Sequence, residues 1–461
     1  MNQAPNRLEI LRTLRFANLD GAFATAFISL LSGTFMVGFV RMLHGADIWI
    51  GLLAAIPSLT GVFQAPGAVL GRRFASYKGY VMPGGLAWRA LYLPIIILPL
   101  VGLATDVRLG LACGLIALAS AAVMMVGPTY NEWLAEMVPA DSRGVFFSRR
   151  NAILIATGAL AALVGAVVLD LFRGAGLEAQ GFSVVFGLGL ACAGLSMGYY
   201  FKMFDLSRAE VRRTDFGQGV RELAAPLADR NFRRVLIFLA AFFVGQMFAG
   251  NLFSAFALET LRLPYTTIQG LSVLQAAGIV LAATAWGRLT DRHGTRPMLA
   301  LSAAGIGLSP LLWLACRPGH DAANIAILAV GHLLIGLVWS GVGVCQFNIL
   351  LATSPAKERA TYLAAGFTVQ TLLAGIAPIL GAWMLTSMRG ATSVEWAYKS
   401  VFLVTMAMRL SAVLLLVPVR EEGSASIRST ARELLSKPGQ TLRKTRAEKN
   451  EEPDDNPQIP A

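Results

Sequence analysis

Charged residues are scarce in this chain. Asp, Glu, Lys and Arg make up 14% of its 461 residues, whereas they make up roughly a quarter of a typical soluble domain. Hydrophobic residues make up 55%. So few charges argue against a soluble enzyme or a set of soluble domains, and they direct attention to the long apolar runs between them.

Cysteine and the motifs of cofactor chemistry are also scarce. The four cysteines, Cys113, Cys192, Cys316 and Cys345, lie in apolar segments without paired spacing, which excludes a disulfide framework or a thiolate metal site. No Gly-rich loop ends in Gly-Lys-Ser/Thr, so direct ATP coupling within this chain is excluded as well. We expect no catalytic residue, no metal and no cofactor, and therefore not an enzyme.

Long apolar runs fill most of the chain. About 20 predominantly apolar residues cross a hydrocarbon core roughly 30 Å thick. Runs of this kind predict spans at 18–42, 48–71, 80–104, 110–136, 148–172 and 182–204, and then at 234–258, 266–288, 297–317, 322–350, 360–386 and 398–419. The pattern predicts an all-α integral membrane protein with twelve transmembrane helices in two six-helix bundles.

A polar connector separates the two groups of six runs. We expect an N-terminal six-helix bundle over 1–204, a cytoplasmic connector over 205–233 and a C-terminal six-helix bundle over 234–420. The remaining residues, 421–461, are polar and end in Pro-rich sequence that buries too little apolar surface to fold alone. They predict a disordered cytoplasmic tail.

Basic residues are distributed unequally between the two sides of the predicted membrane. The net charge is +12, but the basic residues punctuate apolar runs and form no patch on a polar domain, which argues against nucleic acid. Of the 39 Lys and Arg residues, two lie within spans, 30 lie on the side of the termini, and seven lie opposite: Arg41, Arg108, Arg173, Arg262, Arg317, Arg389 and Lys399. By the positive-inside rule, both termini are predicted to be cytoplasmic at the inner (plasma) membrane.

The two halves carry traces of a duplication. The motif around Pro139 recurs around Pro355, and Gly165 followed by alanine recurs as Gly381 followed by alanine, both at an offset of 216 residues. Six spans per half give the two repeats the same orientation, related by an axis along the membrane normal.

The stretch GRLTDRHGTR carries a glycine, acid and base pattern between predicted spans eight and nine. Its marked positions are Gly287, Asp291, Arg292, Gly294 and Arg296. The stretch resembles the signature loop of the major facilitator superfamily, in which it is commonest between spans two and three. Together with twelve spans, the connector and the repeat, the resemblance covers essentially the whole chain. It implies a monomeric protein in the lipid bilayer that moves a small-molecule substrate.

In that family the signature loop latches the two halves together. The symmetry of the repeat places the partner of Asp291 at the cytoplasmic start of span five, near Arg149 and Arg150. The alternative is a solvated loop whose charges only fix the topology.

Span ten carries one stripe of polar, aromatic and small residues at helical spacing. Its members are His332, Gly336, Trp339, Gly343 and Gln346. In the family, spans one, four, seven and ten line the central cavity, so the resemblance implies that this stripe faces the substrate. Helix packing is the equal alternative. Gln246 and Asn251 in span seven make a weaker case of the same kind.

Three ionisable residues lie within or near the ends of the first-half spans, where they must be paired or face water. They are Asp20, Arg89 and Glu132. Alternating span directions bring all three toward the cytoplasmic half of the first bundle, so we expect a protonatable site in which Arg89 balances the carboxylates. The alternative is a purely structural set of ion pairs.

The leading hypothesis is a secondary active transporter that uses alternating access and couples to a proton or cation gradient. One alternative is proton-coupled efflux of hydrophobic or cationic compounds, because the span-eleven segment from Gly375 to Gly381 resembles part of an antiporter pattern. A second alternative, from another class, is a receptor or assembly factor with a transporter fold that binds without turnover.

Overall fold

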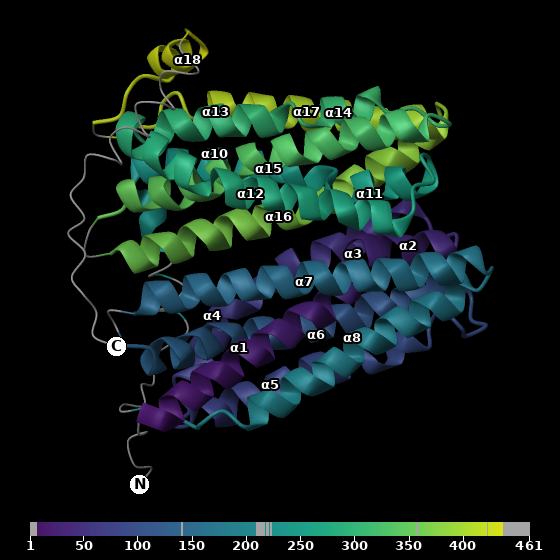
Figure 1. The fold of residues 1–461 in the computed structure, drawn as a ribbon. Coiled ribbons are helices and arrows are strands. Elements are labelled where there is room, and N and C mark those ends of the chain that lie inside the picture. Colours follow the sequence, from purple (N-terminus) through teal and green to yellow (C-terminus); the bar gives the residue numbers. More distant parts are fainter. Residues whose placement is uncertain are drawn as a thin grey trace.

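The computed structural model describes residues 7–139, 142–208, 217, 221, 224–355, 358–421 and 423–436. In Figure 1 the long helices run side by side in two stacked groups, the purple and blue helices below and the green and yellow helices above. We call these groups the N bundle, residues 7–208, and the C bundle, residues 224–421.

Each bundle is a chain of long helices with short breaks. The N bundle contains α1 (Arg7–Leu30), α2 (Thr34–Met42), α3 (Asp47–Leu59), η1 (Thr60–Phe63), α4 (Gln64–Gly71), α5 (Tyr77–Ala90), η2 (Leu93–Ile96), α6 (Thr105–Met137), α7 (Arg143–Gly174) and α8 (Glu178–Phe201). The C bundle contains η3 (Ala225–Ala228), α10 (Arg230–Phe248), α11 (Gly250–Glu259), α12 (Tyr265–His293), α13 (Thr295–Gly307), α14 (Pro310–Ala315), α15 (Asp321–Ala352), α16 (Arg359–Arg389) and α17 (Val394–Leu414), and α18 (Ile427–Ser436) follows it.

Eleven stretches of the described residues are long and apolar enough to cross a membrane. They correspond to eleven of the twelve predicted spans, so the all-helical membrane fold is confirmed. The exception is the third span, predicted at 80–104. There α5 ends at Ala90, and the chain continues through tight turns in which Tyr92 N bonds to Arg89 O and Ile95 N to Tyr92 O. Pro94 lacks the backbone donor that a continuous α-helix needs.

Spans one and seven are broken at equivalent places. Gly33, at φ 54°, separates α1 from α2, and Ala249 separates α10 from α11. The two positions differ by 216, the offset of the sequence repeat. The outer pieces, α2 and α11, pack against each other across the bundles, with Thr34 Oγ1 and Ser254 Oγ 3.3 Å apart. The breaks therefore turn two helix ends toward the bundle interface.

Large apolar side chains cover much of the surface. Val280 is 73% exposed, Leu171 69% and Trp383 65%. Exposing so many large apolar side chains to water is unfavourable, whereas exposing them to the hydrocarbon of a bilayer is not. The exposed apolar surface and the long spans together define an integral membrane protein.

The polar segment that follows α17 departs from its prediction. Disorder was predicted from residue 421, yet Ile427–Ser436 forms α18, which packs on α13. Glu421 fixes the approach to this helix, because its carboxylate accepts hydrogen bonds from the backbone of Thr295 and Arg296. Most of the remaining tail and much of the predicted connector lie outside the described residues.

Candidate functional site

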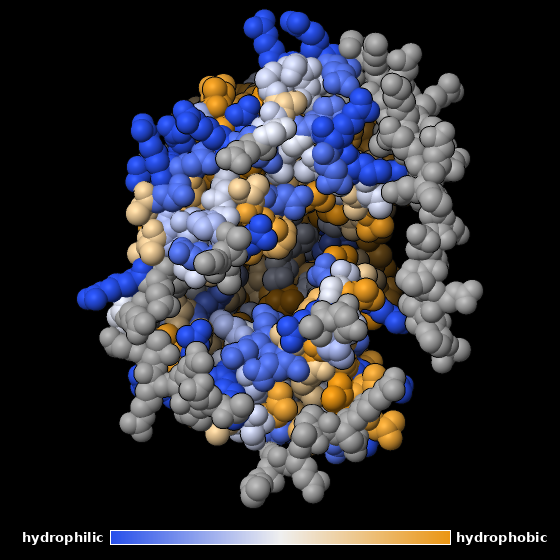
Figure 2. All heavy atoms as spheres, turned by 90° about the vertical axis from the view of Figure 1, so that its left-hand side faces the viewer, coloured by the Kyte–Doolittle hydropathy of each residue, from blue (hydrophilic) through white to orange (hydrophobic). Residues whose placement is uncertain are grey.

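The two ends of the bundle interface differ. We call the end at which α1, α7 and α16 begin the mouth end, and the end at which α2, α7 and α16 stop the closed end. Figure 2 looks onto the mouth end, the left-hand side of Figure 1, and shows a hollow between the two bundles with apolar side chains in its depth. The mouth end is the side that the charge distribution predicts to be cytoplasmic.

Two adjoining cavities are lined mainly by the N bundle. The first cavity, of ≈ 230 Å³, lies among α1, α5, α6, α7 and α8. The second cavity, of ≈ 430 Å³, lies beside the Gly33 break and reaches Asn251 of the C bundle. Ile28, Trp88 and Val123 line both cavities. The first carries the ionisable groups, whereas the second is mostly apolar.

Asp20 of α1 is the centre of the polar wall of the first cavity. Arg89 Nη2 and Ser196 Oγ donate to its Oδ1 at 3.0 and 2.6 Å, and Tyr130 Oη donates to its Oδ2 at 2.9 Å. Asp20 and Arg89 are both buried. Four helices, α1, α5, α6 and α8, thus meet at one carboxylate, and a change in its charge is felt by all four.

Arg89 is held on several sides. Its Nη1 donates to Gly85 O at 2.9 Å, and its guanidinium lies 4.8 Å from the centre of the Trp88 ring. A Cβ on Gly85 would lie 3.4 Å from Arg89 Nη1, an ordinary contact distance. The last turn of α5 therefore presents a paired arginine at the place where the helix stops.

Arg150 of α7 also lines the first cavity, but its partners are neutral. Its Nη2 donates to Tyr130 Oη at 3.2 Å and to Ala17 O at 3.4 Å. Within the described part of the chain, no carboxylate lies within ion-pair distance of it. The guanidinium lies over Gly21, where a Cβ would be 2.6 Å from Nη2. One carboxylate and two guanidinium groups therefore line this cavity.

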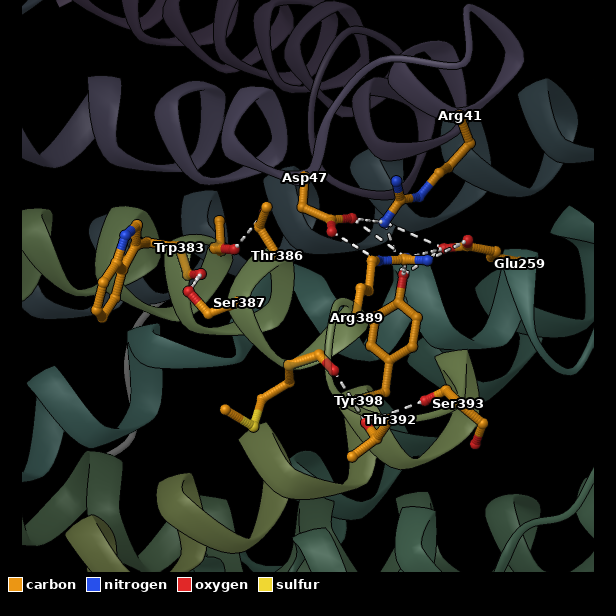
Figure 3. A network of polar contacts seen from close by, with 12 residues as sticks. Arg41, Asp47, Glu259, Trp383, Thr386, Ser387, Arg389, Thr392, Ser393 and Tyr398 are labelled. Carbon is orange, nitrogen blue, oxygen red and sulfur yellow. Dashed lines mark hydrogen bonds and ion pairs between the residues drawn. The ribbon is translucent and has the colours of Figure 1, made fainter.

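The closed end carries a network of charges that joins the two bundles, shown in Figure 3. Its members are Arg41 and Asp47 of the N bundle and Glu259, Arg389 and Tyr398 of the C bundle. Arg389 Nε lies 2.7 Å from Asp47 Oδ2 and its Nη2 lies 2.6 Å from Glu259 Oε2. Arg41 pairs with Asp47 and with Glu259, and Tyr398 Oη donates to Glu259 at 2.6 Å. We call these five residues the closed-end network.

A second contact crosses the interface at the same end. Asp170, near the end of α7, accepts hydrogen bonds from the backbone N–H groups of Tyr265 and Thr266 at 2.9 and 2.8 Å. It thus caps the N-terminus of α12, where a negative charge is favoured. The repeat relates this contact, from the end of α7 to the start of α12, to the contact from the end of α16 to the start of α3 in which Arg389 meets Asp47.

The signature loop lies at the mouth end and contacts the C-terminal segment. Arg292 lies 3.3 Å from Glu433 of α18, and Arg296 donates to Val419 O at 2.7 Å. Asp291 is exposed. Gly294, at φ 90°, makes the sharp turn between α12 and α13, whereas a Cβ on Gly287 would meet open space.

The predicted latch between Asp291 and span five is not formed in this structure. Arg149 is exposed, and Arg150 faces Tyr130 in the first cavity. The mouth end is open here, so the two sides of the predicted latch belong to bundle ends that a hollow separates. The latch stays a prediction for a state in which this end is closed.

The span-ten stripe makes packing contacts. The His332 ring lies 5.6 Å from Trp313, the Trp339 ring lies 6.4 Å from Phe243, and Gln346 donates to Gln370 at 2.8 Å. A Cβ on Gly336 would meet the backbone at Gln275, whereas one on Gly343 would meet open space. None of these residues lines either of the two cavities. A substrate-facing role for the stripe stays a prediction.

The two span-seven candidates are separated. Asn251 lines the second cavity. The backbone carbonyl of Gln246 accepts from Arg409 at 3.5 Å, and the side-chain oxygen of Gln246 is buried without a partner in the described part of the chain. Of the two, only Asn251 is placed to meet a solute.

Glu132 lies apart from Asp20 and Arg89, contrary to the predicted three-residue site. Its Oε2 lies 2.5 Å from Arg208, and Tyr77 donates to its Oε1 at 3.3 Å. The reason is helical geometry. Tyr130, two residues earlier in α6, points at Asp20, and positions two apart on an α-helix face nearly opposite directions.

Several site residues escaped the sequence analysis. Trp88, Tyr130 and Tyr200 of the first cavity, and Ser196, which donates to Asp20, are uncharged and gave no signal above the surrounding apolar pattern. The sequence did contain a signal for the closed-end network. Arg41 and Arg389 are two of the seven basic residues on the side of the membrane where basic residues are rare. A basic residue on that side, with an acid at a neighbouring span end, is a signal for an ion pair across the interface.

Known proteins resemble this chain in sequence over part of its length. The model of the Major Facilitator Superfamily matches residues 235–449. The proline/betaine transporter of Escherichia coli (strain K12) is 28% identical over 131 residues, 27% of this chain. That match spans 25% of the relative's length. The relative of the same name from Salmonella typhimurium is 27% identical over 131 residues.

Solved structures match over nearly the whole chain. The inward-open xylose transporter XylE from E. coli aligns with a TM-score of 0.66 at 16% identity, covering 92% of this chain and 99% of that one. The nucleoside transporter NupG aligns with a TM-score of 0.64 at 12% identity, covering 89% and 98%. The chain is an integral membrane protein with the major facilitator fold. The family model matches less than half of the chain, so the comparisons establish the fold.

Proposed function

We propose that this protein is a secondary active transporter that moves a small solute across the inner membrane by alternating access. One observation carries the proposal. The bundles are joined by ion pairs at the closed end, while a hollow opens between them at the mouth end. A path closed at one end and open at the other is one of the two states that alternating access requires.

The second state needs the closed end to part. The closed end is held by polar contacts, the closed-end network and the Asp170 cap, and by apolar packing of α2 on α11, α3 on α16 and α7 on α12. Water can replace the hydrogen bonds when the bundles rock apart, whereas the apolar packing is lost on opening and must be offset by new contacts in the second state. The breaks at Gly33 and Ala249 place α2 and α11 where they meet in one state and separate in the other.

Asp20 is the proposed coupling residue, with a proton as the coupling ion. Arg89, Ser196 and Tyr130 all donate to its carboxylate, so protonation weakens three contacts at once. Uptake of a proton from one side and release to the other would then favour different arrangements of α1, α5, α6 and α8. Glu132 is no longer proposed for this role, because it pairs with Arg208.

The relatives support a small solute. Those reported above are named as transporters of proline and betaine, of xylose and of nucleosides. The first cavity, at ≈ 230 Å³, and the adjoining second cavity are large enough for a molecule of this size class and not for a polymer.

Efflux of cations is less well supported. The span-eleven glycines that motivated it pack between helices, since a Cβ on Gly375 would meet Ser58 and Leu59 and one on Gly381 would meet the backbone of Phe248. The first cavity also holds more guanidinium than carboxylate groups, which repels a cationic solute.

Counterflow and gradient-driven uptake in proteoliposomes test the proposal. We expect wild-type protein to accumulate at least one member of a panel of proline, betaine, xylose and nucleosides when a pH gradient is imposed. Asp20→Asn should keep exchange of that solute but lose accumulation, because an amide cannot carry the proton. Asp321→Asn, an exposed carboxylate at the start of α15, is the matched control and should keep both. Binding without flux would favour the receptor alternative.

A further inference from the structure

We propose that the first cavity binds the carboxylate of a small organic monoanion, and that Arg150 is the residue that recognises it. The inference rests on the proposed function of the same cavity, and it adds the chemical class of the solute. It depends on three observations: the charges that line the cavity, the unused donors of Arg150, and the way that α1 makes room for its guanidinium.

The charges of the cavity wall do not balance. Asp20, Arg89 and Arg150 are its ionisable groups with full charges near neutral pH, and they sum to +1 when Asp20 is ionised. Asp20 is already paired, because Arg89 meets it at 3.0 Å, and Ser196 and Tyr130 donate to it as well. A guanidinium away from bulk water requires a counter-charge. The solute is the component that can supply it.

Some N–H donors of Arg150 have no acceptor among the described residues. Within the described part of the chain, only its Nη2 donates to protein acceptors, and these are the uncharged Tyr130 Oη and Ala17 O. Its Nε is buried without an acceptor. A guanidinium has five N–H donors in a planar fork that matches the two oxygens of a carboxylate. In the described ranges, Nη1 is the free end of the fork and can donate to a carboxylate oxygen.

The backbone around Arg150 is arranged to admit it. A Cβ on Gly21 would lie 2.6 Å from Arg150 Nη2 and 2.9 Å from its Cζ. Any larger residue at position 21 must push the guanidinium away from the cavity wall. Tyr130 joins the two charged groups, because its hydroxyl accepts from Arg150 and donates to Asp20. Arg150 is therefore held beside Asp20 without being neutralised by it.

The rest of the lining defines the remainder of the solute. Ala24, Ile28, Val123 and Leu154 are apolar, and Trp88 adds an aromatic face. A wall of this kind suits a hydrocarbon portion attached to the carboxylate. A single excess positive charge favours a monoanion, since a dianion would leave one negative charge unbalanced in an apolar cavity. The predicted solute is a small monocarboxylate with an apolar body.

Binding to the purified full-length chain tests the inference without any need for transport. The probes are valerate and benzoate, each compared with its primary amide and its primary amine of the same carbon skeleton, and methyl phosphate is the dianion control. The readouts are the melting temperature and the fluorescence of tryptophan, because Trp88 lines the cavity. We expect saturable stabilisation by at least one carboxylate and none by its amide or amine.

Variants locate the site. Arg150→Gln should weaken carboxylate binding about ten-fold or more, which is the size expected for losing hydrogen bonds to a charged group. Arg150→Lys keeps the charge but not the fork and should fall between the two. Gly21→Ala should also weaken binding. Arg143→Gln is the matched control, since Arg143 lies two turns earlier on the same face of α7 and donates to Val138 O. It should change affinity by less than about two-fold.

Each result decides the matter. Equal binding of carboxylate and amide, absence of binding by both carboxylates, or preference for methyl phosphate would overturn the inference, and none of these requires a variant to fold. Unchanged affinity in a folded Arg150→Gln would also overturn it. The proposed function fails separately: carboxylate binding without flux in proteoliposomes would support the site in a receptor, whereas flux of an uncharged solute alone would support transport without this site.

Discussion

The two ends of the bundle interface use charge in opposite ways. At the closed end, Arg389 of the C bundle meets Asp47 of the N bundle, so opposite charges join the bundles. At the mouth end, the described ion pairs stay within one bundle, with Arg208 on Glu132 in the N bundle and Arg292 on Glu433 beside the C bundle. The charges at one end therefore hold two bodies together, whereas those at the other end brace each body separately.

This difference indicates where the free energy of the rocking motion resides. Opening the closed end must expose Asp47, whose side chain is 4% exposed, and separate it from Arg389 of the C bundle. Closing the mouth end has no such pair to break. The relative stability of the two states thus depends on the closed-end network together with the apolar packing between the bundles, and any ligand that shifts the balance must offset the loss of both.

The largest expected effect comes from Arg389→Gln. It leaves Asp47 and Glu259 with Arg41 as their only shared cation within the described residues, and we expect the open-mouth state to lose about 2 kcal/mol, between the values for exposed and buried pairs. The ratio of states should then change roughly 30-fold. The measurement is labelling of Ser32→Cys, in the second cavity, by an impermeant maleimide from the outside, in a chain whose four cysteines are replaced by alanine.

Lys399→Gln is the control for this experiment. Lys399 lies at the same end and pairs with Glu395 at 2.6 Å, but both residues belong to α17. It should leave outside labelling at the wild-type level. Equal labelling in the two variants would show that the closed-end network does not hold the bundles together.

The same background sharpens the comparison at the mouth end. If opening one end closes the other, cysteines placed by Asp291→Cys and Arg149→Cys should cross-link in the Arg389→Gln chain and only weakly in its absence. The gain should be several-fold, following the population of the state with a closed mouth end. If the yield of the cross-link is the same with and without Arg389→Gln, the two ends move independently or the signature loop meets another partner.

These results bear on what sequence alone could provide. Spans followed from hydropathy because a bilayer demands long apolar helices, and the method missed only the segment where α5 stops at Ala90 and the chain tightens before Pro94. The pairing of Asp20 with Arg89 was also within reach, since two opposite charges inside neighbouring spans have few other partners. The structure brings them to 3.0 Å.

The sequence could not predict two features: the direction in which each side chain points from its helix, and the contacts between span ends that are distant in the chain. Glu132 and Tyr130 differ by two positions in α6, yet only the tyrosine faces Asp20. Arg150 was assigned to a latch, although it faces the first cavity. Asp47 and Arg389 are separated by 342 residues and meet only because α3 and α16 pack side by side across the two bundles. The rise of 1.5 Å per residue predicts how deep in the membrane a residue lies. The neighbour that its side chain contacts depends on how the helices pack.

A smaller effect is expected from Asp170→Asn. The amide oxygen can still accept from the N-terminus of α12, but the charge that complements the helix end is lost. We expect the open-mouth state to lose about 0.5–1 kcal/mol, with a two- to five-fold rise in outside labelling of Ser32→Cys. An effect as large as that of Arg389→Gln would contradict the ranking of the two closed-end contacts.

Glu132→Gln should act on one bundle only. It weakens the bond to Arg208 in a half-exposed position, so the free energy of unfolding should fall by less than about 1 kcal/mol. Outside labelling should stay at the wild-type level, and uptake driven by a pH gradient should persist. Loss of that uptake with normal exchange would return Glu132 to the coupling site and would weaken the case for Asp20.

The smallest effect is expected from Glu433→Gln in α18. Glu433 lies 3.3 Å from Arg292 and 3.6 Å from His293, and its side chain is 44% exposed, so solvent screens both contacts. The substitution should speed amide hydrogen exchange across 427–436 by less than about five-fold, because the Glu421 carboxylate still holds the approach to this helix at Thr295 and Arg296. Labelling at the closed end should not respond, since these contacts brace the C bundle and cross no interface. A clear change in that labelling would show that α18 is coupled to the rocking motion, and the division between joining charges at one end and bracing charges at the other would then have to be abandoned.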